Sequence, residues 1–154
     1  VSGGPSSCCE SISRTDLCAY AEKIVQETGF SGLAMFEFKC GAGGAPRLLE
    51  INPRVWGTFP LTRASGSDFA YSWFCLSSDL PLPEAQPASP VRMVYYPADF
   101  AAALGYLKAG KPGRLFAVLQ DFINPAVKNG LADKKDPAPA RAYFRNLLHR
   151  GGHK

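Results

Sequence analysis

The sequence lacks the features of a membrane, secreted or zinc-binding protein. Its 154 residues contain no run of 18 apolar residues, which excludes a membrane-spanning helix. The five cysteines are an odd number without a Cys-x-x-Cys pair, so neither a disulfide framework nor a zinc site is indicated. The opening VSGGPSSCCES has neither the basic start nor the apolar core of a signal peptide. We therefore expect a cytoplasmic protein with reduced thiols.

The composition is that of a globular domain with an uneven charge. A hydrophobic content of 46% is enough for a core and argues against disorder. Residues 1–80 carry six Lys/Arg and eight Asp/Glu, whereas residues 81–154 carry eleven and five. A basic half could bind nucleic acid, but its cations are scattered and are not interleaved with aromatic residues. Nucleic-acid binding is therefore not favoured.

The spacing of apolar residues predicts an α+β fold, with an antiparallel sheet flanked by helices and a helical carboxy-terminal extension. Leu17 and Ile24 belong to a stripe with helical spacing, whereas GLAMFEFKC and PRLLEIN are typical of strands on either side of the turn GAGGA. Further helices are expected near residues 60–66, 68–76, 100–107, 115–122 and 137–148, with a strand at 91–96. The first expected part covers residues 1–78 and contains the hairpin 33–52, and a proline-rich connection follows over 79–90. Residues 91–150 are expected to form a strand and helices that pack on the first part, and residues 151–154 to form a tail.

Two acidic residues face each other if these strands form a hairpin. Strand side chains alternate between faces, so Glu50 and Asn52 share one face. A turn centred in GAGGA places Glu37 directly opposite Glu50 and Lys39 opposite Leu48. Like charges at paired positions repel by roughly 0.2–1 kcal/mol, more if the face is covered. The pairing therefore needs an explanation.

A divalent cation would relieve this repulsion. Mg²⁺ prefers hard oxygen ligands and often shares them with substrate phosphates, and Glu37, Glu50 and the Asn52 amide could supply such ligands. Arg54 follows, and its guanidinium can bind a phosphate or carboxylate through two hydrogen bonds. The alternative is a solvated polar face on which two acids happen to align.

At these residues the chain resembles the carboxy-terminal lobe of ATP-grasp ligases. The residues that carry the resemblance are GLAMFEFK followed by RLLEINPRVWGTFPLTRASGSDFA, and GGPSSCCESI resembles the Gly-Gly-x-Ser loop of the family. The closest likeness is to the carbamoyl-phosphate-synthase-like group and to predicted carboxylate–amine ligases. It is specific over residues 29–70, weaker over 3–28 and loose after 90.

The resemblance implies an ATP-dependent ligation through an acylphosphate. Glu37, Glu50 and Asn52 match the ligands of Mg²⁺ or Mn²⁺ in the ATP site. Leu49 matches a wall of the adenine pocket, and Arg54 matches the catalytic arginine near the reacting phosphate. The implied substrates are a small carboxylate and an amine or a thiol.

The resemblance also implies a partner for this chain. In the family, a preceding amino-terminal lobe supplies lysines to the phosphates and a linker to the adenine, and no residue here matches them. We expect the chain to be part of a ligase about twice as long or of a complex, and to be inactive alone. Two alternatives remain open: a degenerate lobe that serves only binding or assembly, and a basic nucleic-acid-binding domain.

Overall fold

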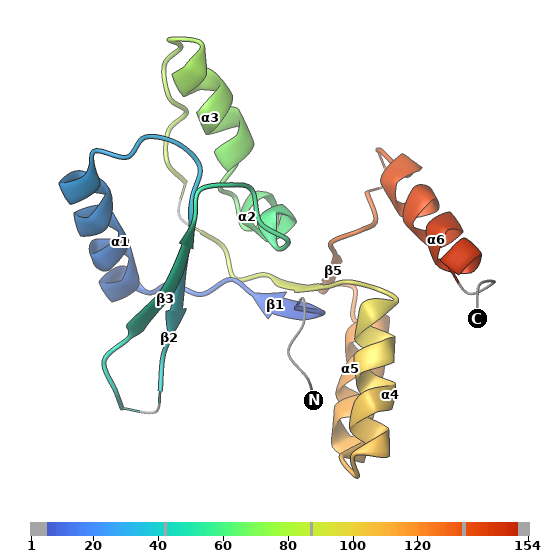
Figure 1. Ribbon diagram of the computed structural model, residues 1–154. Helices are drawn as coiled ribbons and strands as arrows, with labels where there is room; N and C mark the ends of the chain where they lie inside the picture. The colour runs from blue at the N-terminus through green and yellow to red at the C-terminus, as the bar shows by residue number, and fades with distance from the viewer. Residues whose placement is uncertain (1–5, 42, 87, 134, 151–154) are drawn as a thin grey trace. The chain divides into compact units, whose positions relative to one another are not determined.

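The computed structural model describes residues 6–41, 43–86, 88–133 and 135–150 (Figure 1). It confirms the predicted α+β class, with two small sheets and six helices in the described residues. None of those helices is long and apolar enough to cross a membrane. The Gly3-Gly4 segment and the tail over 151–154 lie outside the described residues.

The chain divides into two compact units. One unit comprises residues 11–90, and the other combines residues 1–10 with residues 91–154. The first contains α1 (Thr15–Thr28), β2 (Met35–Lys39), β3 (Arg47–Asn52), α2 (Phe59–Ala64) and α3 (Phe69–Ser77). The second contains β1 (Cys8–Glu10), β4 (Arg92–Val94), α4 (Ala98–Lys108), α5 (Pro112–Ile123), β5 (Lys128–Asn129) and α6 (Ala138–Arg150).

In the unit of residues 11–90, β2 and β3 form an antiparallel hairpin beside α1 (Figure 1). The N–H of Gly44 donates to the carbonyl of Gly41 at 3.3 Å, and Gly43 has a φ of 71°, so the glycine-rich segment is the predicted turn. Helix α1 ends at Gly29, whose φ of 62° is the left-handed conformation that glycine adopts without strain. Asp68 caps α3 by accepting the N–H of Tyr71 at 3.0 Å.

The other unit is built on a three-stranded sheet in the order β1–β4–β5. Strand β4 pairs antiparallel with β1 and parallel with β5, so this sheet is mixed. Met93 and Val94 of β4 are buried, as are Ala103 of α4 and Val118 of α5. These four side chains are its buried apolar core.

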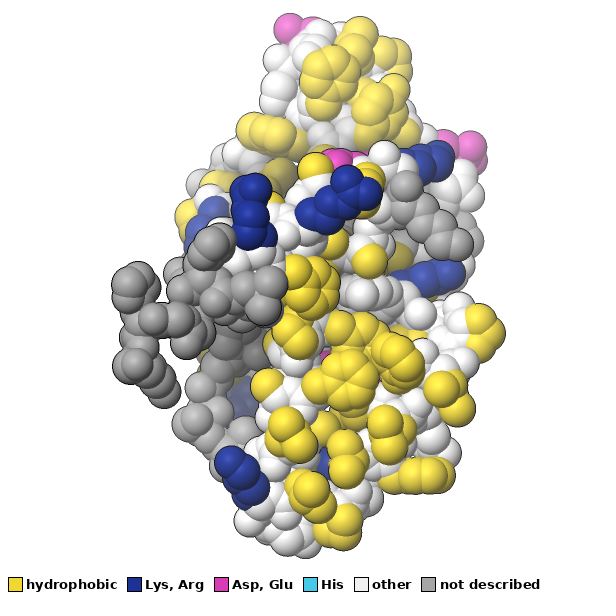
Figure 2. Space-filling model, turned by 90° about the vertical axis from the view of Figure 1, so that its right-hand side faces the viewer, with side chains coloured by type: hydrophobic (Ala, Val, Ile, Leu, Met, Phe, Trp, Pro, Cys, Tyr) yellow, Lys and Arg dark blue, Asp and Glu magenta, His cyan; other side chains and the backbone are white. Residues whose placement is uncertain are grey.

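Many large hydrophobic side chains of this second unit remain exposed. Figure 2 shows hydrophobic side chains gathered over the face formed by α4 and α5. Phe116 and Ile123 are 63% and 77% exposed, so this face carries a real apolar patch. Its members are Leu104, Leu107, Phe116, Leu119, Phe122 and Ile123.

Candidate functional site

The predicted pairing of the two acids is confirmed. Glu37 of β2 is the cross-strand partner of Glu50 of β3, and Met35 is the partner of Asn52. Both carboxylates are exposed. Paired side chains on a hairpin project from the same face, with Cβ atoms roughly 4.5–5.5 Å apart. The two carboxylates are therefore close enough to interact with one ion.

Asn52 joins this pair through a direct hydrogen bond. Its Nδ2 donates to Oε1 of Glu50 at 2.6 Å, as expected for residues two apart on one strand. The amide oxygen and the second carboxylate oxygen remain as acceptors on the same face. Glu37, Glu50 and Asn52 are thus an all-oxygen donor set that fits Mg²⁺ or Mn²⁺.

The same set does not fit zinc. Within the described ranges, no group of three or more His, Cys, Asp and Glu side chains is placed to hold a metal ion of any kind, so a cation at this face would need the Asn52 amide as well as the two carboxylates. Zinc prefers nitrogen and sulfur ligands, and the hairpin offers neither. Two carboxylates and an amide are a normal protein share for Mg²⁺, which keeps waters and takes substrate oxygens for the rest.

One detail of the predicted register is wrong. Lys39 pairs with Arg47 rather than with Leu48, and Leu48 pairs with Phe38, because the register shifts after Glu37. Leu49 has no counterpart on β2 and forms a bulge, with its side chain 55% exposed. The bulge turns Leu48 away from the face of the carboxylates, because Leu48 shares the face of Phe38.

Arg54 follows the donor set after a tight turn. Its N–H donates to the carbonyl of Asn52 at 2.8 Å, and its Nη1 donates to the carbonyl of Val55 at 3.1 Å. Arg54 also lines a hollow of about 340 Å³ with Pro53 and with Trp73 of α3. A guanidinium beside a hollow of this size can receive an anion such as a carboxylate or phosphate.

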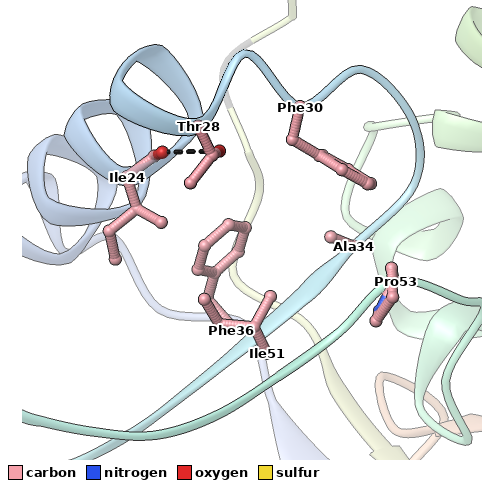
Figure 3. A pocket seen from close by; sticks show the side chains of 7 residues that line it. All are labelled: Ile24, Thr28, Phe30, Ala34, Phe36, Ile51 and Pro53. Carbon is pink, nitrogen blue, oxygen red and sulfur yellow. Dashed lines mark hydrogen bonds between the residues drawn. The ribbon is translucent and has the colours of Figure 1, made fainter.

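The other face of the hairpin carries an apolar cavity. Figure 3 shows the side chains of Phe36 and Ile51 directed toward α1, where they help to line a cavity of about 350 Å³. Phe36 and Ile51 are paired with each other and alternate with Glu37 and Glu50, so this cavity lies on the face opposite the carboxylates. The remaining lining residues are Ile24, Thr28, Phe30, Ala34 and Pro53. A ligand in this cavity would not meet the carboxylates.

Cys8 and Cys9, which the sequence places side by side, are not activated thiols. All five cysteines are free, and Cys75 is buried. Burial is the main cause that raises the pKa of Cys8 and of Cys9, so their thiols stay protonated at neutral pH.

Sequence reasoning missed a second group of charged residues in the unit built on β4. Asp99 of α4 is 4% exposed, and Arg92 of β4 binds Asp121 of α5 through two hydrogen bonds of 2.8 and 2.7 Å. A signal was present in the sequence, because Asp99 lies three, four and seven residues before Ala102, Ala103 and Tyr106. That spacing puts an acid on the same helix face as small apolar residues.

Comparison with known proteins gives one family match. Residues 5–97 match the family described as "ATP-grasp in the biosynthetic pathway with Ter operon". This segment includes the whole hairpin and Arg54. No curated protein and no solved structure matches the chain.

Proposed function

This chain belongs to the ATP-grasp family, and on that premise we propose that it is the metal- and phosphate-binding carboxy-terminal lobe of a carboxylate–amine ligase. We place it with the carbamoyl-phosphate-synthase-like or carboxylate–amine ligases of that family. The pairing of Glu37 with Glu50 carries the proposal, because it lies inside the matched segment and matches the donor chemistry of an ATP–Mg²⁺ site.

The proposed reaction has two steps. A substrate carboxylate oxygen attacks the γ-phosphorus of ATP, the bond to ADP breaks, and an acylphosphate forms. An amine or a thiol then attacks the acyl carbon, phosphate leaves, and the nucleophile loses its proton to water. The first step needs positioning and neutralisation of charge more than covalent help from the protein.

Each residue of the site has a role in this scheme. Glu37, Glu50 and Asn52 would hold Mg²⁺ or Mn²⁺, which when bound neutralises charge on the phosphate oxygens. Leu49 would lie against the adenine, for which its exposed position in the bulge is suited. Arg54 is the proposed catalytic residue, because its guanidinium could bind the transferred phosphoryl group or the acceptor carboxylate.

We further propose that the ligase needs a second lobe, in the same chain or in a partner, that grips the nucleotide from the other side. Hydrogen bonds to adenine and cations for the phosphates are required for a closed ATP site, whereas the proposed site consists of two acids, an amide, Leu49 and Arg54. On this view the 154-residue chain alone binds Mg²⁺ weakly and does not catalyse ligation. Reduced cysteines and the use of ATP are consistent with a cytoplasmic enzyme.

The test is release of ADP by the natural polypeptide that contains this sequence. The assay contains Mg²⁺, ATP and a panel of small carboxylates, with and without amines. We expect ADP release that depends on a carboxylate and falls by at least about 100-fold in Glu50→Gln. Glu22→Gln, on the exposed surface of α1, is the matched control and should retain full activity.

The outcome separates an enzyme from a binding module. Equal ADP release by wild type and Glu50→Gln would contradict the assigned metal role. If the wild type is inactive with every carboxylate and Glu50→Gln still assembles normally with its partners, the chain is a non-catalytic lobe and the ligase proposal fails.

A further inference from the structure

A further cavity lies in the unit built on β4, where no functional residue has been assigned. Its volume is about 330 Å³, within the range of sites for small molecules. It is bounded by the start of β1, by β4, and by one face each of α4 and α5. On both helices the lining residues recur at positions i, i+3, i+4 and i+7, which is one face of a helix. The lining residues from α4 are Asp99, Ala102, Ala103 and Tyr106, and those from α5 are Arg114, Ala117, Val118 and Asp121.

Asp99 is the most unusual of these residues. Its side chain lines the cavity although the residue is only 4% exposed. Oδ1 accepts a hydrogen bond from Oγ of Ser7 at 3.0 Å, but Oδ2 has no hydrogen-bond partner in the described structure. A buried carboxyl oxygen without a donor is unfavourable, so this atom is suited to accept a donor from a ligand.

The other charges differ in how far they are already neutralised. Arg92 and Asp121 bind each other through two hydrogen bonds, and Arg92 also pairs with Glu10. Arg114 contacts no carboxylate among the described residues, and its guanidinium carbon lies 5.7 Å from the centre of the Tyr106 ring. The cavity therefore presents one buried acceptor without a donor and one exposed cation without an acidic partner.

We propose that this cavity binds a small amino acid as a zwitterion. Its ammonium group donates to Asp99, and its carboxylate accepts from Arg114. Asp99 and Tyr106 are seven residues apart on α4, a rise of about 10 Å along the helix, and Arg114 stands over Tyr106. The two ends of the ligand are thus recognised at opposite ends of the cavity, with Ala102 and Ala117 leaving room between them.

Ligands with one charge fit this arrangement less well. A phosphate bound to Arg114 would leave Oδ2 of Asp99 without a donor. A simple amine could satisfy Asp99 but would leave Arg114 without an anion. The proposal does not depend on the ATP-grasp reaction, because the helices α4 and α5 lie outside the matched residues 5–97.

The test is isothermal titration calorimetry on the full chain with a matched series of ligands. Glycine, β-alanine and γ-aminobutyrate separate the two charged groups by one, two and three carbons. Ethylamine, propionate and inorganic phosphate each carry only one kind of charge. We expect at least one amino acid to bind about tenfold more tightly than all three single-charge ligands.

Substitutions test which residue binds each end of the amino acid. Asp99→Asn and Arg114→Gln should each weaken the best amino acid by about tenfold or more, and Ala102→Leu should prevent binding by filling the cavity. Arg141→Gln on α6 is the matched control and should bind as the wild type does. The unfolding midpoint of each variant shows that it is folded. The proposal is overturned if no amino acid binds up to about 10 mM, if a single-charge ligand binds as tightly, or if the first two variants keep wild-type affinity.

Discussion

Glu37 lies directly opposite Glu50 in the β2–β3 hairpin, with both carboxylates exposed on one face. Two like charges at paired positions destabilise a hairpin unless a cation or a hydrogen-bond donor lies between them. Asn52 donates to Glu50 alone, so it offsets only part of this repulsion. A divalent cation at the proposed site would relieve the remaining repulsion.

Replacing one of the two acids should therefore affect stability in opposite directions with and without Mg²⁺. In EDTA, Glu50→Gln removes the repulsion and should raise the free energy of unfolding by roughly 0.2–1 kcal/mol. In Mg²⁺, the wild type should gain stability by ligand binding, whereas the variant should gain much less. Thermal unfolding in the two buffers measures both effects, with Glu22→Gln as the control. Equal gains from Mg²⁺ in wild type and Glu50→Gln would exclude Glu50 as a ligand.

Adding a third acid to this face should lower the stability in EDTA and increase the gain in stability from Mg²⁺. Asn52→Asp replaces the donor to Glu50 by a carboxylate, which should cost about 1–2 kcal/mol in EDTA. Because the new carboxylate is also a better metal ligand, the stabilisation by Mg²⁺ should exceed that of the wild type. Thermal unfolding with increasing Mg²⁺ checks the prediction, and Asn146→Asp on α6 controls for the added charge. A smaller response to Mg²⁺ than in the wild type would contradict it.

The bulged leucine should matter for nucleotide binding and little for folding. Leu49→Ala removes a side chain that is 55% exposed, so the free energy of unfolding should change by less than about 0.5 kcal/mol. In the ligase assay we expect the KM for ATP to rise several-fold with kcat largely retained, because an adenine contact contributes equally to ground and transition states. An unchanged KM would remove Leu49 from the proposed adenine pocket.

The register of the carboxylates could be predicted because local rules determine it. A glycine-rich turn between two alternating strands leaves few pairings, and Glu37 opposite Glu50 follows from the best-centred one. The bulge at Leu49 could not be predicted, because alternation assumes one residue opposite one and the sequence carries no glycine there. Strands β1 and β5 were also missed, since they are three and two residues long and pair with a distant strand.

The charged cavity was missed for a related reason. Sequence patterns suggest that the apolar stripes through Leu104 and Leu119 face inward, yet these side chains are 56% and 46% exposed. Ala103 of the predicted α4 stripe is buried as expected, but the residue buried beside it is Asp99, which the stripe does not contain. Hydrophobicity alone does not identify a face that buries an acid, because burial of that acid depends on Ser7 from another element.

The ion pair of Arg92 should be important for the stability of its unit. Arg92 joins β4 to α5 through Asp121, whose side chain is 13% exposed, and also pairs with Glu10 of β1. Arg92→Gln leaves Asp121 half-buried without its cation, and we expect a loss of about 1–3 kcal/mol in unfolding free energy after allowing for the partial exposure of Arg92. Urea denaturation measures this loss. The control is Arg63→Gln, whose exposed pair with Asp68 spans 3.9 Å and should be worth less than about 0.5 kcal/mol. Equal effects of the two substitutions would show that the Arg92 pair is not structural.

The stability of the same unit should depend on the ionisation of Asp99. Burial is the main cause that raises the pKa of Asp99, and the charge of Asp121 adds to it, whereas Ser7 and Arg92 act in the opposite direction. A carboxyl group whose pKa is higher in the folded state stabilises fully below its unfolded pKa of 3.8, and this contribution is lost as pH rises through the folded value.

Asp99→Asn cannot ionise and therefore avoids that loss. Relative to the wild type, the variant should gain stability as pH is raised from about 3.8, and the difference should level off once Asp99 is ionised. Ser7→Ala should change the wild type in the opposite direction, because without the Ser7 hydroxyl the ionised carboxylate loses its one donor and stability falls more with rising pH. Unfolding midpoints measured across this range check both expectations. Parallel pH profiles for wild type and Asp99→Asn would mean that Asp99 has the same pKa folded and unfolded, and the buried carboxyl group would then have a donor that satisfies it.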